Sequence, residues 1–429
     1  MTKEIEQIYE IFLRHPQIGT DTRKDLHGKI FWALKGERFD ANEFIPSALE
    51  KGAVVAISDS PAYKNHPRII VVEDTLKMLQ ALARHHRRQS KTKIIAITGS
   101  NGKTTTKELV FNVLSQKYKT IATQENLNNH IGVPLTLLRI RPDTEIAVVE
   151  MGTNHFGEIE TLCRIAEPDF GYITSFGEAH LEFFGDLQGV IHAKTELYRY
   201  LKQNDKTVFV NFDDSIQERK TAQMKRFGFT FKNHPEAQIK LKPLKDFPFV
   251  SFQIEHQSIQ THLSGAFHLN NAGAAACIGK YFAVETEKIK NGIETYIPQN
   301  NRSQIIRKGK LTIIADAYNA NPTSMKAALE QLSKQPGKKL AVLGDMLELG
   351  EKSQAKHREI IEFLKQKQIP AVLIGKNFSA AGNHAYILEK YETRDQFPVD
   401  RFLNPNEEKI ILIKASRSFA LEKLLEKIS

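Results

Sequence analysis

The sequence of 429 residues contains only two cysteines, Cys163 and Cys277, and a single tryptophan. One disulfide would add little to a chain of this length, so we expect two free thiols in a reducing compartment. No apolar run reaches the roughly 18 residues that a membrane helix needs, and the first residues are acidic and have no apolar signal core. These absences exclude a disulfide scaffold, predict no membrane span and favour a cytoplasmic location.

Extremes of composition are also lacking. Apolar residues make up 41% and charged residues 26% of the chain, which is ordinary for a globular protein and excludes wholesale disorder. Lysine and arginine exceed aspartate and glutamate by 60 to 50, and a net charge of +10 favours anionic partners. The densest basic stretch, 84–88, has few interleaved aromatics, so no nucleic-acid partner is expected. We expect a solvated helix end there, followed by a linker at 87–93.

Strand-length apolar runs alternate with helical patterns, which predicts an α/β protein with parallel sheets. The length favours two to four domains, and the pattern divides the chain at about 90 and 300. The expected domains are 1–90, 91–300 and 301–429. The expected strands are 30–34, 53–57, 68–72, 94–98, 146–150, 170–174, 207–210, 311–315, 339–343, 371–374 and 409–413. Antiparallel strands are expected within 226–264. The expected helices include 105–116, 270–282, 324–333, 353–367 and 418–428.

A glycine-rich loop lies between the expected strand 94–98 and the following helix. It reads Gly99-Ser100-Asn101-Gly102-Lys103-Thr104-Thr105. Glycines let backbone N–H groups curl around phosphate oxygens, a lysine adds charge, and a threonine hydroxyl can bind Mg²⁺. Ile97 stands where the full phosphate-loop pattern has its first glycine, but the remaining pattern is met. The loop therefore predicts ATP binding.

Three further residues could serve a second metal ion. Glu150 ends an expected strand, His180 follows another, and Lys194 lies 14 residues after His180. Carboxyl ends of parallel strands converge on the ligand crevice of open α/β sheets. A carboxylate and an imidazole there can hold Mg²⁺, although Mg²⁺ usually prefers oxygen. From position alone, Glu150 could equally be an ordinary strand-end acid, His180 a structural hydrogen-bonding residue, and Lys194 a surface charge.

Together these motifs resemble the Mur ligase family of ATP-dependent amide-forming enzymes over nearly the whole chain. The most discriminating run, Asp316-Ala-Tyr-Asn-Ala-Asn-Pro322, differs in sister ligases and in folylpolyglutamate synthases. The other matching runs are 98–105, 126–136, 150–152, 179–182, 344–350 and 414–417. The resemblance implies a three-domain architecture with a central P-loop ATPase domain and a Rossmann-like C-terminal domain. It also implies that D-alanyl-D-alanine is added to a UDP-N-acetylmuramoyl-tripeptide, through an acyl phosphate, in peptidoglycan precursor synthesis.

The resemblance also implies residue roles, with ATP and Mg²⁺ as cofactors. Lys103 and Thr104 would hold the ATP phosphates and Mg²⁺, while Glu150 and His180 would bind a second Mg²⁺ beside a carbamylated Lys194. The remaining ATP contacts would be Gly99, Ser100, Asn101, Gly102, Thr105, Asn271, Arg302 and Asp316. The implied substrate contacts are Thr22, Arg23, Lys35, Asn128, Asn129, Tyr318, Asn319, Asn321 and Asp345. The runs 21–23 and 33–37 resemble the loops that hold the UDP end of the donor.

Some positions depart from the family pattern. Phe267-His268 replaces the usual His-Asn, the first domain reads Asp40-Ala41-Asn42, and Ala415 stands for glycine. Asn319, Asn321 and Pro322 could simply form a turn, and Asp345 could cap the following helix. Two alternatives stay open: a sister ligase with another acceptor pocket in 301–429, and a nucleotide-binding regulator without catalysis. We expect a monomer, and the third residue of the tripeptide is left open.

Overall fold

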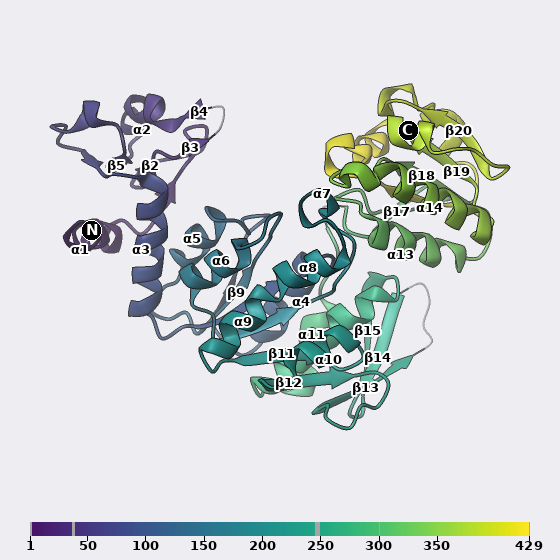
Figure 1. Ribbon diagram of the computed structural model, residues 1–429, viewed down its shortest axis with the longest axis horizontal. Coiled ribbons are helices and arrows are strands. Elements are labelled where there is room, and N and C mark those ends of the chain that lie inside the picture. The colour runs from purple at the N-terminus through teal and green to yellow at the C-terminus, as the bar shows by residue number, and fades with distance from the viewer. Residues whose placement is uncertain (1, 37–38, 245–248, 300, 429) are drawn as a thin grey trace. The chain divides into compact units, whose positions relative to one another are not determined.

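The computed structural model describes residues 2–36, 39–244, 249–299 and 301–428 (Figure 1). The chain folds into two compact units, each with its own helices and strands. The first unit comprises Met1–Ile97, Tyr118–Thr153 and Gly157–Gly171. The second comprises Thr98–Lys117, Asn154–Phe156 and Tyr172–Ser429. The mixture of helices with largely parallel sheets confirms the predicted α/β class.

The N-terminal part of the first unit is a small parallel sheet with helices. Its strand order is β1-β2-β5-β6, and all three strand pairs are parallel. The strands are β1 (Ile18–Gly19), β2 (Ile30–Trp32), β5 (Val55–Ser58) and β6 (Ile69–Val71), and the helices are α1 (Thr2–Arg14), α2 (Ile45–Glu50) and α3 (Thr75–Gln89). Lys35–Gly36 (β3) and Phe39–Asp40 (β4) form a short antiparallel pair. The three strands predicted here are confirmed within two residues.

The basic stretch 84–88 belongs to α3 and is not a solvated linker. Arg87 pairs with Asp169 at 2.8 Å and donates to the carbonyl oxygens of Ala166 and Glu167. Arg84 and Arg88 bind the Glu167 carboxylate. These carbonyls end helix α6 (Glu158–Ala166), whose C-terminus attracts cations. The expectation of a linker beginning at residue 87 is therefore wrong, because the arginines neutralise a helix end.

The middle of the chain contributes strands to both units. In the first unit, β7 (Lys93–Thr98), β9 (Ile146–Glu150) and β8 (Thr120–Ala122) pair in parallel. In the second, β11 (Thr207–Asn211), β12 (Lys225–Thr230) and β13 (Ile239–Leu244) are parallel, whereas β14 (Phe249–Ile254) and β15 (Gln257–Ser264) continue antiparallel. Strand β10 (Phe170–Ile173) crosses from one unit to the other. The antiparallel prediction for 226–264 is thus wrong for β12, because helix α10 (Ser215–Thr221) provides a parallel crossover.

The helices of this middle region carry much of the second unit's core. Helix α4 (Lys103–Ser115) packs on α11 (Phe267–Tyr281) and α12 (Thr286–Glu294). Four alanines of α11 are buried, and their small side chains let the helices approach closely. Helices α8 (Leu187–Lys194) and α9 (Glu196–Gln203) follow one another with only Thr195 between them. The helices predicted at 105–116 and 270–282 are confirmed, each starting two or three residues earlier than expected.

The C-terminal part of the second unit is a six-stranded sheet of order β16-β17-β21-β18-β19-β20. Its strands are β16 (Gln304–Lys308), β17 (Leu311–Ala315), β18 (Lys339–Gly344), β19 (Ala371–Ile374), β20 (Ile387–Tyr391) and β21 (Lys409–Lys414). Only the edge pair β16–β17 is antiparallel. Helices α13 (Pro322–Ser333) and α14 (Ser353–Lys367) lie together beside this sheet (Figure 1). The Rossmann-like prediction is confirmed, but 418–428 forms 3₁₀ turns (Arg417–Phe419, Leu421–Lys427) and not the predicted α-helix.

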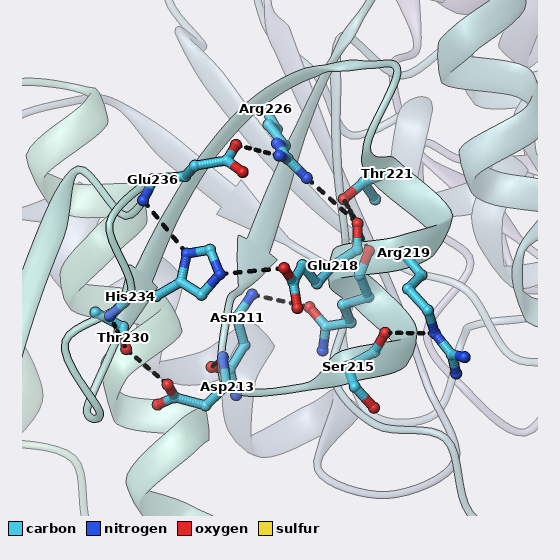
Figure 2. A network of polar contacts seen from close by, with 11 residues as sticks. Asn211, Asp213, Ser215, Glu218, Arg219, Thr221, Arg226, Thr230, His234 and Glu236 are labelled. Carbon is cyan, nitrogen blue, oxygen red and sulfur yellow. Dashed lines mark hydrogen bonds and ion pairs between the residues drawn. The ribbon is translucent and has the colours of Figure 1, made fainter.

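A polar network fastens α10 to the segment after β12 (Figure 2). The Asp213 carboxylate accepts hydrogen bonds from the Thr230 hydroxyl and the Phe231 N–H, both 2.6 Å long. His234 Nε2 lies 3.1 Å from the Glu218 carboxylate, and Arg226 donates to the Glu218 carbonyl at 3.3 Å. The network therefore connects α10 and the residue pair before it to side chains of β12 and of the segment that follows β12.

We expect the Asp213→Ala substitution to lower the melting temperature by roughly 2–5 °C, because hydrogen bonds to a charged group contribute about 1.5–3 kcal/mol. Differential scanning calorimetry measures the shift. Asp205→Asn is the matched control, since Asp205 is largely exposed, pairs with an exposed Lys225, and has a φ of +54° that asparagine tolerates better than alanine. Equal melting temperatures for the two variants would contradict a stabilising role of the network.

Candidate active site

The glycine-rich loop takes a backbone conformation that only glycine adopts easily. Gly99 and Gly102 have φ angles of +146° and +81°. A Cβ on Gly99 would lie 1.9 Å from Thr174 Oγ1, and one on Gly102 would lie 2.7 Å from Asn271 Oδ1. The side chains of other residues are thus excluded by both conformation and space. Asn271, predicted to contact adenine, lies against this loop and also hydrogen-bonds His268 at 3.1 Å.

Side chains after β10 hold the loop in shape. The Ser100 hydroxyl donates to the Gly177 carbonyl at 2.9 Å and accepts from the Gly177 N–H at 3.0 Å. Asn101 accepts from the Thr174 hydroxyl at 2.6 Å and donates its N–H to Ser175 Oγ at 3.0 Å. The loop runs into the N-terminus of α4, where backbone N–H groups lack partners within the helix and favour an anion.

The two hydroxyls that begin α4 differ in exposure. Thr104 is half-buried at the start of the helix and Thr105 is buried. Burial raises the pKa of Tyr296 to about 12, and its hydroxyl hydrogen-bonds Thr105. Lys103 Nζ donates to the Gly99 carbonyl at 2.8 Å, so its charge lies over the loop. Thr104 is therefore the hydroxyl better placed to serve a ligand.

Glu150 is a buried acid with one oxygen left over. In the first unit it pairs in register with Ile97, the residue before Thr98, and is only 1% exposed. Asn128 Nδ2 donates to Oε1 at 2.7 Å, whereas Oε2 is buried without a hydrogen-bond partner among the described residues. A buried oxygen without a partner is a natural ligand for a cation. Asn129 instead accepts from the N–H groups of Ile131 and Gly132, where α5 (Gly132–Leu137) begins.

Lys194 is a buried lysine at the end of α8. Its side chain is only 1% exposed, so the surface-charge alternative is wrong. Burial, assisted by the positive charge of Lys103, lowers the pKa of Lys194 well below its usual value. A neutral amine is the form that reacts with CO₂ to give a carbamate. The environment of Lys194 therefore suits the modification that the family resemblance implies.

His180 lies in the left-handed backbone region, with a φ of +54°. Its Nδ1 is 2.6 Å from Oε2 of Glu348. Nδ1 is buried and makes no well-aligned hydrogen bond with a described residue. The two side chains are therefore close enough to hydrogen-bond, but the angle between them is unfavourable. Contact with His180 lowers the pKa of the Glu348 carboxyl, which therefore stays ionised at neutral pH. Glu348 was not among the residues predicted from the sequence.

The predicted C-terminal contacts lie around β17 and β21. Asp316 pairs with buried Lys414 at 2.6 Å and accepts from the Ser303 N–H at 3.1 Å. The guanidinium of Arg302 stacks 3.5 Å above the ring of Tyr318. The Asn319 side chain caps its own turn through the Ala320 N–H. Arg302, Tyr318 and Asp316 thus form one polar cluster at the ends of these strands.

Asn321 and Asp345 both cap helices. Asn321 forms a capping box with Ser324 at the start of α13, and its Nδ2 also donates to Oδ1 of Asn101 at 2.8 Å. The simple turn weighed for 319–322 is therefore not formed, because Asn321 caps α13 and Pro322 begins it, and the Asn321 side chain reaches the phosphate loop as well. Asp345 accepts from the N–H groups of Asn377 and Phe378, so it caps α15 (Lys376–Ala380) and not the next helix in the chain. Its substrate role stays a prediction.

The predicted UDP-end contacts are exposed and held by local ion pairs. Arg23 makes a two-pronged contact with Asp21, and Lys35 pairs with Asp59 at 3.0 Å. The carbonyl of Thr22 accepts from Lys51 at 2.6 Å. Glu37, in the run 33–37, lies outside the described residues. These cations are available at the surface of the first unit.

Within the described ranges, no group of three or more His, Cys, Asp or Glu side chains could hold a metal ion. The predicted ligand set contains only two such residues, because its third member is a lysine. In the first unit, Glu150 has an unpartnered buried oxygen that suits Mg²⁺, and in the second unit, the lowered pKa of Lys194 favours the neutral amine from which a carbamate forms. No described helix is long and apolar enough to cross a membrane.

Comparison with protein families gives three matches in chain order. Residues 16–87 match the Mur ligase family catalytic domain, 97–279 the Mur ligase middle domain, and 301–417 the Mur ligase, glutamate ligase domain. The chain belongs to the Mur ligase family. The three-domain Mur ligase architecture expected from the sequence is therefore confirmed.

Individual members of this family are similar over almost their whole length. The UDP-N-acetylmuramoyl-tripeptide–D-alanyl-D-alanine ligases of Bacillus subtilis and Escherichia coli are 35% and 34% identical, over 99% and 95% of this chain and 97% and 92% of their own. A crystal structure of MurF from Acinetobacter baumannii is 32% identical with a TM-score of 0.86, covering 96% of this chain and 93% of that one. MurF from Thermotoga maritima, in complex with ADP, is 28% identical with a TM-score of 0.84, covering 96% and 97%.

The pKa of Lys194 predicts a pH-dependent stability difference. A lysine buried as the neutral amine must lose its proton on folding, and this cost shrinks as pH rises toward the unfolded pKa of about 10.4. In CO₂-free buffer without metal, Lys194→Met should therefore melt at least about 2 °C above the unsubstituted protein at pH 7. The advantage should decline by pH 10 in scanning calorimetry. A variant that melts lower at pH 7 would contradict the neutral, desolvated lysine.

Proposed function

We propose that this protein is an ATP-dependent ligase that joins D-alanyl-D-alanine to a UDP-N-acetylmuramoyl-tripeptide in peptidoglycan precursor synthesis. The observation that carries the proposal is the hydrogen bond from Asn321 to Asn101. It connects the run 316–322, which distinguishes this activity within the family, directly to the phosphate loop. The names and nearly complete coverage of the relatives support the same activity.

The reaction follows from the weakness of a carboxylate as an electrophile. A carboxylate oxygen of the tripeptide attacks the γ-phosphorus of ATP, and the bond between that phosphorus and the bridging oxygen breaks. ADP is the leaving group, and the tripeptide becomes an acyl phosphate. The neutral amine of D-alanyl-D-alanine attacks the acyl carbon. The tetrahedral intermediate expels inorganic phosphate and the nitrogen loses a proton, which gives the amide. The protein supplies position and charge neutralisation.

The phosphate loop binds the nucleotide in this proposal. The N–H groups at the start of α4 contact the phosphates, and Lys103 leaves the Gly99 carbonyl to neutralise the transferred group. Arg302 and Asp316 reach the phosphates and the ribose from the C-terminal cluster. Asn271, beside Gly102, contacts the adenine end. The acceptor is bound by Tyr318 and Asn319, which lie in the same run as Asn321.

Mg²⁺ would be held by Thr104 at one position and by Glu150, His180 and carbamylated Lys194 at another. When bound, the ions neutralise the crowded phosphate oxygens. Lys194 becomes an oxygen ligand when its neutral amine attacks CO₂ and releases a proton to water. Its burial keeps the amine neutral and therefore ready for this reaction.

The domain assignment of the proposal is 1–90 for the UDP end, 91–300 for ATP and 301–429 for the acceptor. In the first domain, Arg23 and Lys35 offer cations to the diphosphate, and Thr22 offers a hydroxyl. On the donor side, Asn128 donates to Glu150, and Asn129 follows it in the loop that leads into α5. We further propose that the protein acts as a monomer in the cytoplasm.

The defining experiment measures phosphate release with ATP, Mg²⁺ and a panel of UDP-muramoyl peptides. We expect release only when UDP-tripeptide and D-alanyl-D-alanine are both present, with the amide product identified by mass. Lysine and diaminopimelate tripeptides are compared in parallel, and N-acetyl-D-alanyl-D-alanine, whose amine is blocked, serves as the matched acceptor control. Equal turnover of a shorter UDP-peptide with a free amino acid would support a sister ligase, and no turnover with any pair would support a regulator.

Loss of the Lys194 side chain should abolish most activity and leave ATP binding intact. We expect Lys194→Ala to ligate at least about 100-fold more slowly, with partial recovery in acetate, which replaces the missing anion. Lys194→Arg should not recover, because guanidinium remains a cation. Steady-state kinetics and calorimetric ATP titration measure the two effects. Wild-type rates in the arginine variant would exclude carbamylation as a requirement.

A further inference from the structure

A loop of the C-terminal sheet lies against the segment that carries His180. The loop follows β18 and leads into the 3₁₀ turn Gly350–Lys352 (η3), which packs on α7 (Leu181–Phe184). The Cα of Glu182 would be 3.3 Å from a Cβ on Gly350, whose φ is +54°. Glycine at 350 therefore allows the loop to approach α7 closely.

Three contacts besides the His180 pair dock this loop. The Glu182 N–H donates to the Glu348 carbonyl at 3.0 Å. Lys352 Nζ donates to the Gly185 carbonyl at 2.6 Å, and Lys356 pairs with Glu178 at 2.8 Å. The loop is thus held at both ends of the segment 178–185 without any contribution from the Glu348 carboxylate.

Other contacts therefore hold the loop in place, and the Glu348 carboxylate is directed at a nitrogen of His180. Both residues have left-handed backbone conformations, with φ angles of +60° and +54°. Such conformations are unfavourable in residues other than glycine and persist only where the surroundings hold them. The fold accepts this strain at both partners of one 2.6 Å contact.

We propose that Glu348 is a positioning residue that fixes the tautomer and orientation of His180. A carboxylate at Nδ1 keeps the proton on Nδ1 and leaves Nε2 as the nitrogen that can bind a metal ion. Metal-binding histidines usually have such a carboxylate or carbonyl partner on the second nitrogen. The inference rests on the proposed function only in taking His180 as a metal ligand.

This arrangement makes the C-terminal sheet part of the metal site without giving it a ligand. His180 belongs to the segment after β10, whereas Glu348 arrives only when the loop after β18 is docked. Orientation of the histidine thus depends on docking of the segment that carries the proposed acceptor contacts. Metal affinity at this position should consequently report whether the loop is in place.

The first measurement is the tautomer of His180 in ¹⁵N-histidine-labelled protein, read from long-range ¹H–¹⁵N correlations and assigned with His180→Gln. We expect the Nδ1–H form in the unsubstituted protein and loss of that preference in Glu348→Ala. Lys352→Met is the matched control, because it removes a contact of the same loop and leaves Glu348 in place. This readout needs neither substrate nor metal, so it stands even if the proposed function fails.

The second measurement is the affinity for Mn²⁺ alone, followed by electron paramagnetic resonance. Glu348→Ala should weaken binding by about 10–100-fold, while Lys352→Met should stay within about twofold. Glu348→Gln keeps the shape and an acceptor oxygen without the charge, so its loss of Mn²⁺ affinity should be smaller. It replaces the alanine variant if that variant does not fold. An unchanged tautomer and Mn²⁺ affinity in the Glu348 variants, or an equal loss in Lys352→Met, would overturn the proposal.

Discussion

The active site depends on a phosphate loop held open before any ligand arrives. Gly99 and Gly102 permit the backbone path, and Thr174, Ser175 and Ser100 fix it with hydrogen bonds of 2.6–3.0 Å. An anion therefore meets preformed N–H groups, and its binding energy is not consumed in ordering the loop. Two of the candidate residues are placed against this loop: Asn271 lies against Gly102, and Asn321 donates a hydrogen bond to Asn101.

Burial affects one acidic and one basic candidate residue in different ways. Glu150 is buried with a partner for one oxygen only, so a cation is the remaining way to satisfy the other. Burial, together with the charge of Lys103, lowers the pKa of Lys194 and so favours its neutral amine, which is the form that reacts with CO₂. Burial thus prepares the two residues, each within its own unit, for different chemistry.

Much of this arrangement could be predicted from local sequence. Strand 146–150, strand 311–315 and helix 353–367 have the predicted bounds because their apolar periodicity and flanking residues agree. The phosphate loop was recognisable from its glycines, lysine and threonines. Two features were not predictable locally: β12 is parallel because of the crossover helix α10, and 418–428 is 3₁₀ because its leucines pack on the final sheet.

The missed functional residues share one property, which is that their partners are distant in sequence. Glu348 contacts His180, which lies 168 positions earlier in the sequence, and no local pattern marks Glu348 except the nearby Gly350. Asn321 reads as a turn residue until its contact with Asn101 is seen. The arginines of α3 read as a solvated end because Glu167 and Asp169 lie some eighty residues away.

The ion pair between Arg87 and Asp169 has a consequence for the sensitivity of the chain to proteases. A run of basic residues is an obvious target for trypsin, but here the scissile backbone is helical through Gln89 and tied to the end of α6. The protease should find the site closed in the folded protein.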